Sequence, residues 1–69
     1  MKTIFLFLIS GFEEVEALAT VDVLRRAGLN VKTVSLTGDA AVVGSHGIPV
    51  VADMLFNQVS LDNAELLVL

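Results

Sequence analysis

The sequence predicts an α/β fold, and specifically the N-terminal part of a doubly wound, mostly parallel sheet. Residues 3–9 form an unbroken apolar run, which is typical of a strand covered on both faces in a parallel sheet. Residues 12–27 follow with a helical pattern, and residues 30–36 have the pattern of a second strand. The connection between these strands is therefore mostly helical and long enough for a right-handed β-α-β crossover.

The charged residues of the helical segment indicate where the helix begins and where it ends. Three glutamates lie in its first turns and two arginines in its last turn, as the helix dipole favours. Gly28 is placed to close the helix, because glycine readily adopts the left-handed conformation found there.

Two short extended segments follow a turn cluster at residues 37–40. Residues 41–43 and 48–51 are separated by Gly44-Ser45-His46-Gly47, which predicts a small hairpin. Pro49 has no backbone N–H to donate, so its strand belongs at a sheet edge.

The last part of the chain is less regular. Residues 53–63 predict one irregular helical turn and a loop, and residues 66–69 predict another central strand. A 69-residue domain without disulfides is near the lower limit for independent folding. Residues 65–69 are mostly apolar with nothing after them to cover the strand, so we expect residues 1–69 to be the N-terminal portion of a larger single domain, truncated after a core strand.

The composition excludes several classes of protein. The chain is 55% hydrophobic and carries 8 acidic and 4 basic residues, which rules out a disordered tail and a nucleic-acid partner. It has no cysteine, so no disulfide, thiolate metal site or cysteine nucleophile lies within it. The first apolar run is too short for a signal peptide or a membrane span, and we expect a cytoplasmic protein without a membrane partner.

Glu16 is the candidate catalytic residue. A helical wheel at about 100° per residue places it near the middle of an apolar arc with Phe12, Val23 and Ala27, whereas Glu14 falls on the opposite, polar side. Glu16 also follows the C-terminal end of the first strand, where open α/β sheets form their ligand crevices. Desolvation there would favour the neutral acid, which could donate a hydrogen bond to a reacting group. The alternative is a rim residue that reaches water and only complements the helix dipole.

The loop and the hairpin exclude nucleotide binding. Residues 10–14 contain one glycine where the dinucleotide fingerprint needs three, and their glutamates would repel a pyrophosphate. His46, the sole histidine, is either an exposed turn residue or a polar group that reaches a crevice, including that of a second subunit. We expect no metal site, because one histidine with scattered carboxylates shows no ligand spacing.

Val15 and Leu18 lie on the otherwise polar face of the helix. Isolated exposed apolar residues are common, but two neighbours three positions apart also suit a helix-mediated dimer contact. We favour the dimer, with Asp22 and Arg26 as its polar rim.

Several runs of the sequence are distinctive together. They are Phe5-Leu6-Phe7-Leu8-Ile9-Ser10-Gly11-Phe12-Glu13-Glu14-Val15-Glu16-Ala17, Val21-Asp22-Val23-Leu24-Arg25-Arg26-Ala27-Gly28, Ser45-His46-Gly47-Ile48 with Val51-Ala52-Asp53, and Ala64-Glu65-Leu66-Leu67-Val68-Leu69. These runs resemble the N-terminus of the ThiJ/PfpI family, and in particular its small, single-domain, dimeric, deglycase-like members. The resemblance implies a flavodoxin-like fold and a homodimer.

The resemblance also implies a chemistry. In the family, the third glutamate of the motif, here Glu16, hydrogen-bonds to a reactive cysteine on a downstream strand-to-helix turn. The whole protein would then be a cofactor-free enzyme acting on small aldehydes or other reactive carbonyls, as a glyoxalase or deglycase-like hydrolase or lyase. Gly11, Phe12 and His46 are the candidate substrate-binding residues, although the family often has arginine where this chain has His46.

The substrate is left open by the family's own names, which include an intracellular peptidase and a label for thiazole monophosphate biosynthesis. The runner-up function is a redox or stress-response sensor, or a chaperone, that reads oxidation of the same cysteine.

Overall fold

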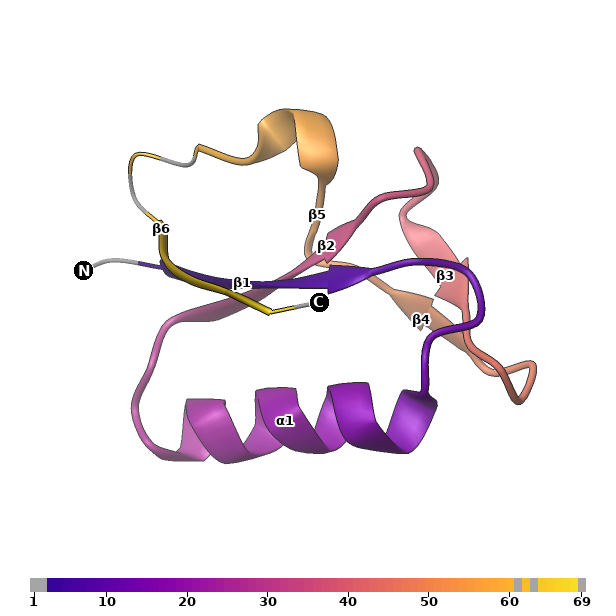
Figure 1. Ribbon diagram of the computed structural model, residues 1–69, viewed down its shortest axis with the longest axis horizontal. Coiled ribbons are helices and arrows are strands. Elements are labelled where there is room, and N and C mark those ends of the chain that lie inside the picture. The colour runs from indigo at the N-terminus through magenta and orange to yellow at the C-terminus, as the bar shows by residue number, and fades with distance from the viewer. Residues whose placement is uncertain (1–2, 61, 63, 69) are drawn as a thin grey trace.

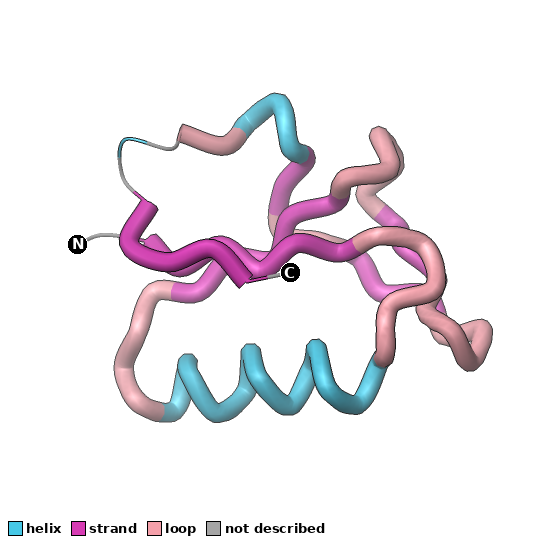
Figure 2. Tube along the Cα trace, in the orientation of Figure 1, coloured by secondary structure: helices cyan, strands magenta, loops and turns pink. Residues whose placement is uncertain are grey.

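The computed structural model describes residues 3–60, 62 and 64–68, and it shows a helix lying along one face of a parallel sheet (Figure 1; Figure 2). The sheet has four strands in the order β5-β2-β1-β6, and every neighbouring pair is parallel. The elements are β1 (Thr3–Leu8), α1 (Glu14–Arg26), β2 (Val31–Ser35), β3 (Ala41–Val43), β4 (Pro49–Val51), β5 (Met54–Leu55), the 3-10 turn η1 (Phe56–Gln58) and β6 (Ala64–Val68). The predicted α/β class is confirmed.

β1 is covered on both faces, as its unbroken apolar sequence predicts. Ile4, Leu6 and Leu8 point toward α1 and join a buried cluster with Val21. On the other face, Phe7 packs edge-on against Phe56, with the ring centroids 6.1 Å apart. Figure 1 shows η1 on the side of the sheet opposite α1.

The ends of α1 show how the chain enters and leaves the helix. The helix begins at Glu14, two residues later than predicted, because Glu13 is still extended at φ −81° and ψ 107°. At the other end, the Gly28 N–H donates to Arg25 and the Leu29 N–H to Leu24, with Gly28 at φ +84°. This is a Schellman motif, and it confirms the predicted role of Gly28.

β3 and β4 form the predicted antiparallel hairpin, in which Val43 pairs with Pro49. The hairpin is a two-stranded sheet of its own, so Pro49 lies at an edge as expected. Figure 2 shows it beyond the β1–α1 loop, at the end of the molecule where α1 begins.

The other strands differ from the predicted bounds by one or two residues. The segment predicted as irregular contains β5, which adds to the edge of the sheet beside β2. β6 begins at Ala64, earlier than predicted, and Leu69 of the predicted strand lies outside the described residues. Within the described part of the chain, no helix has the length and apolar character needed to cross a membrane.

Candidate functional site

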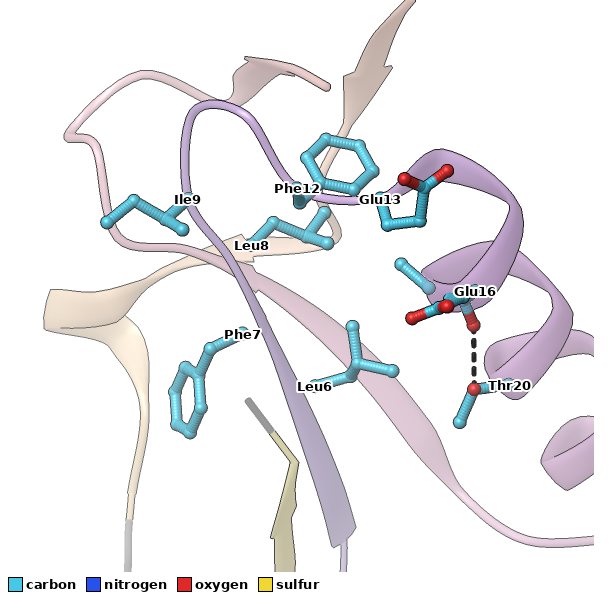
Figure 3. A pocket seen from close by; sticks show the side chains of 9 residues that line it. Leu6, Phe7, Leu8, Ile9, Phe12, Glu13, Glu16 and Thr20 are labelled. Carbon is cyan, nitrogen blue, oxygen red and sulfur yellow. Dashed lines mark hydrogen bonds between the residues drawn. The ribbon is translucent and has the colours of Figure 1, made fainter. Parts of the chain in front are cut away.

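A pocket of about 290 Å³ opens at the C-terminal end of β1 (Figure 3). One wall is the end of the strand, and the other is the first two turns of α1 with the loop that precedes it. Its lining is mainly apolar, with two carboxylates and one hydroxyl: Leu6, Phe7, Leu8, Ile9, Phe12, Glu13, Glu16, Ala17 and Thr20. This is the location at which open α/β sheets bind their ligands.

Glu16 lines this pocket, as its position after the first strand suggests, but its side chain is exposed. The predicted desolvation of Glu16 is therefore not found within the described residues, and desolvation by the rest of the protein stays a prediction. The apolar arc on the wheel is not the face that packs on the sheet, since Val23 and Ala27 are exposed. The buried face of α1 instead runs through Val21, with Ala17 and Leu24 partly buried beside it.

Glu14 is the carboxylate that the fold buries, with 3% of its surface exposed. Its Oε2 accepts hydrogen bonds from the backbone N–H of His46 at 2.8 Å and of Ile48 at 3.3 Å. Its Oε1 lies 2.9 Å from His46 Nδ1 and accepts a hydrogen bond from the Ser45 hydroxyl at 3.4 Å. Both oxygens therefore contact the hairpin turn and not the pocket.

The electrostatics of this contact favour a charged pair. Burial alone would raise the pKa of Glu14, but hydrogen bonds from the His46 ring and from backbone N–H groups outweigh it and lower the pKa from 4.5 to about 2. The hydrogen bond to Glu14, aided by the charges of Glu13 and Glu14, raises the pKa of His46 above its usual 6.5. An ionised Glu14 and a protonated His46 stabilise each other.

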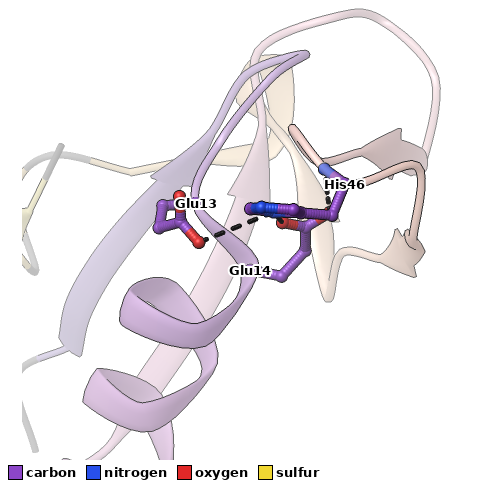
Figure 4. Close-up of side chains that lie close together, drawn as sticks. All are labelled: Glu13, Glu14 and His46. Atoms are coloured by element: carbon purple, nitrogen blue, oxygen red, sulfur yellow. Dashed lines mark hydrogen bonds and ion pairs between the residues drawn. The ribbon is translucent and has the colours of Figure 1, made fainter.

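Figure 4 shows the His46 ring close to Glu13 and Glu14, and His46 itself does not line the pocket. Its Nδ1 is 3.7 Å from Oε1 of Glu13, and Glu13 is a pocket residue. Glu13, Glu14 and His46 each place one potential ligand atom within 4.8 Å of the others, a grouping that the spacing argument against a metal site did not predict. The hydrogen bonds of Glu14 account for the cluster without an ion.

The remaining predicted site residues do not belong to the cluster of Glu13, Glu14 and His46. Of the candidate substrate-binding residues, Phe12 lines the pocket, whereas Gly11 forms the exposed turn before it, at φ +88°. In the predicted dimer contact, Val15 is 74% exposed and Leu18 is 41% exposed. The members of its expected rim, Asp22 and Arg26, pair with each other at 2.9 Å.

Comparison with known proteins identifies the family. The model of the DJ-1/PfpI family matches residues 2–69. The chain belongs to this family. Protein DJ-1 homolog B of Arabidopsis thaliana is 41% identical over 59 residues, which cover 86% of this chain and 14% of that protein. Protein dj-1beta of Drosophila melanogaster is 37% identical over 68 residues, covering 99% of this chain and 36% of that protein.

Solved structures of DJ-1 proteins have the same fold. Oxidised Toxoplasma gondii DJ-1 superposes with a TM-score of 0.90 at 30% identity, covering 97% of this chain and 36% of that chain. A DJ-1 superfamily protein of Salmonella typhimurium superposes with a TM-score of 0.79 at 43% identity, covering 84% of this chain and 31% of that chain. These matches confirm the predicted resemblance and the flavodoxin-like fold. The chain spans 14% to 36% of the lengths of the curated DJ-1 relatives it matches.

Proposed function

We propose that the whole protein binds a small reactive carbonyl compound in the pocket beside Glu16 and acts as a cysteine-dependent enzyme of the glyoxalase or deglycase type. Membership of the DJ-1/PfpI family supports this proposal, together with the resemblance that assigns Glu16 to a reactive cysteine. The 69 residues contain no cysteine, so the nucleophile would come from outside them, and this segment alone would have no activity.

The observation that carries the proposal is the position of Glu16. Its side chain lines a pocket at the C-terminal end of β1, where a ligand of a parallel α/β sheet is expected. The pocket's apolar walls, formed by Leu6, Leu8 and Phe12, suit a short carbon chain and would exclude water from it. A carboxyl group beside such a surface is well placed for proton transfer to a bound carbonyl.

The proposed step moves one proton and forms one bond. The cysteine thiolate attacks the carbonyl carbon, a carbon–sulfur bond forms, and the electron pair of the C=O double bond moves to the oxygen. Neutral Glu16 first donates a hydrogen bond to the sulfur, which favours the thiolate, and then gives its proton to the developing oxyanion. This role requires that the rest of the protein covers Glu16 and removes it from water.

The test is turnover of methylglyoxal by the full-length protein. We expect Glu16→Gln to lose activity by roughly 100-fold or more, because general acid–base groups contribute about 10²- to 10⁴-fold. Asp62→Asn makes the same acid-to-amide change at an exposed position away from the pocket and is expected to retain activity. Unchanged turnover in Glu16→Gln would overturn the proposed role of Glu16.

A second candidate function is redox sensing by the same cysteine. One solved relative, the DJ-1 of Toxoplasma gondii, is in an oxidised form. If the full-length protein shows no turnover of methylglyoxal but its thiol oxidises readily with peroxide, the sensor function replaces the enzyme.

A further inference from the structure

The hairpin turn is attached to the loop that forms one side of the pocket. The Gly11 N–H donates to the carbonyl of Val43 at 2.9 Å, and the Ser45 N–H donates to the carbonyl of Phe12 at 2.8 Å. Glu14, the first residue of α1, accepts hydrogen bonds from the backbone N–H groups of His46 and Ile48. The loop and the first residue of α1 are thus joined to the end of β3 and to the turn that follows it.

Glu14 is the buried member of this contact, and the proposed chemistry does not use it. Its carboxylate faces away from the pocket, and its oxygens are occupied by the turn. The packing around it is tight, because a Cβ added at Gly44 would overlap its carboxyl group. A buried carboxylate with several hydrogen bonds to one neighbouring segment is suited to fixing the position of that segment.

We infer that Glu14 is a positioning residue for the pocket: by tying the hairpin turn to the start of α1, it fixes the loop that carries Phe12 and Glu13. This inference rests on the proposed function in one respect, since it assigns the pocket as the substrate site. The attachment itself is independent of any activity. We call this contact, made by Glu14 with residues 44–48, the hairpin clamp.

His46 makes the hairpin clamp depend on pH. Its Nδ1 faces two carboxylates of α1, Glu14 at 2.9 Å and Glu13 at 3.7 Å, and within its own turn it lies 3.0 Å from the Ser45 hydroxyl. These are the titratable and charged groups that face it among the described residues. Protonated His46 therefore draws Glu13, a pocket residue, toward the hairpin.

The direction of the pH effect follows from the two titrations. The pKa of His46 is raised in the folded protein. The attraction between protonated His46 and the carboxylates therefore contributes fully to the hairpin clamp below the usual pKa of 6.5, and it is lost as the pH rises through the raised pKa. Neutral His46 can still donate one hydrogen bond to Glu14, so the clamp weakens without opening. The pocket loop is expected to be more mobile at alkaline pH than at neutral pH.

The test measures amide hydrogen exchange and the His46 titration by NMR in the full-length protein. In Glu14→Ala, we expect the exchange of the Gly11 and Ser45 amides to accelerate by roughly tenfold or more, since charge-assisted hydrogen bonds are lost. The amide of Val34, in the buried strand β2, should stay protected and thereby show that the fold is intact. Unchanged exchange at Gly11 and Ser45 would overturn the inference.

Glu14→Gln keeps the test decisive if the alanine variant unfolds. The glutamine oxygen can still accept from the turn, so the amides should remain protected, while the pKa of His46 should fall toward its usual value. Asp22→Asn, which removes an exposed carboxylate from the same helix, should change neither measurement. An unchanged His46 titration in Glu14→Gln would contradict the coupling.

The kinetic readout separates the clamp from the proposed chemistry. A positioning role predicts that Glu14→Ala changes KM for methylglyoxal more than kcat, whereas Glu16→Gln should lower kcat. The exchange and titration measurements need no turnover. If they respond as expected while methylglyoxal is not turned over, the clamp stands and the proposed activity fails.

Discussion

Replacing Gly44 by alanine tests the packing of the hairpin clamp directly. Gly44 is buried, and it is not among the glycines with positive φ, so residues other than glycine can adopt its backbone conformation. The obstacle is steric, because the new Cβ would overlap Cγ, Cδ and Oε2 of Glu14. The Glu14 side chain must then move and give up its contacts with the turn.

The size of the effect follows from two opposing contributions. Overpacking a tight site costs about 1–3 kcal/mol of unfolding free energy, whereas glycine-to-alanine at a permitted φ stabilises by about 0.4–1 kcal/mol through the unfolded state. We expect Gly44→Ala to destabilise the wild-type protein. In a Glu14→Ala background, all three overlapping atoms are absent, so the same substitution should become stabilising. The backbone contribution is the same in both backgrounds and cancels, so the coupling between the two positions is roughly 1–3 kcal/mol.

The assay is urea unfolding of the four proteins of this double-mutant cycle, followed by far-UV circular dichroism. These 69 residues contain neither tryptophan nor tyrosine, so fluorescence would not report on them. Gly47→Ala is the matched control, because Gly47 has φ +76° and no atom within 4 Å of an added Cβ. Its cost should come from the backbone alone, about 1–2 kcal/mol, and should not depend on Glu14. Equal destabilisation by Gly44→Ala in both backgrounds would refute the steric reasoning.

Two further predictions concern assembly and acid stability. We propose that the whole protein is a homodimer through the α1 face that carries Val15 and Leu18. Leu18→Lys should then shift the protein from dimer to monomer in analytical ultracentrifugation. A dimer that persists in this variant would exclude this face as the interface. Burial would raise the pKa of Asp53, but hydrogen bonds from Thr33 and the charge of Arg25 lower it below 3.8, as the hairpin lowers that of Glu14. Stability should therefore be lost as the pH falls below about 4.5 and toward 2 in urea titrations, and a constant stability across that range would contradict both assignments.

The local sequence predicts those parts of the fold that depend on neighbours along the chain. The β1–α1–β2 unit follows from apolar periodicity, the end of α1 from Gly28, and the hairpin from the glycine-bounded turn before Pro49. Each of these signals acts within a few residues, so each can be recognised without knowing the rest of the structure.

The position of β5 depends on a contact that is distant in sequence. The Asp53 carboxylate accepts hydrogen bonds from the Thr33 N–H at 2.9 Å and from Arg25 at 2.7 Å, and the Asp53 N–H donates back to Thr33. This contact holds the start of β5 beside β2. A two-residue strand has no periodicity of its own, so residues 53–63 predict only an irregular segment.

Glu14 was missed for a related reason. The helical wheel compares residues of one helix only. It places Glu14 at the edge of the side that carries charged residues, between Arg25 and the apolar Val21. The hairpin covers that side of the first turn and supplies the donors that make burial of a carboxylate favourable. A signal in the sequence is the short Gly44-Ser45-His46-Gly47 turn itself, in which a small residue, a hydroxyl and an imidazole could together surround a carboxylate.

The spacing of Glu14 and Glu16 explains how the first turn of one helix can contribute to both the hairpin clamp and the pocket. Successive residues of an α-helix are rotated by about 100°, so Glu14 and Glu16 point about 200° apart and cannot share one environment. One reaches the hairpin turn, and the other reaches the pocket. Glu13, at the N-cap, lies between these directions and contacts both. The same chemical change therefore has different consequences at the two positions: removing the carboxyl group of Glu14 should alter the placement of the loop, and removing that of Glu16 should alter the reaction.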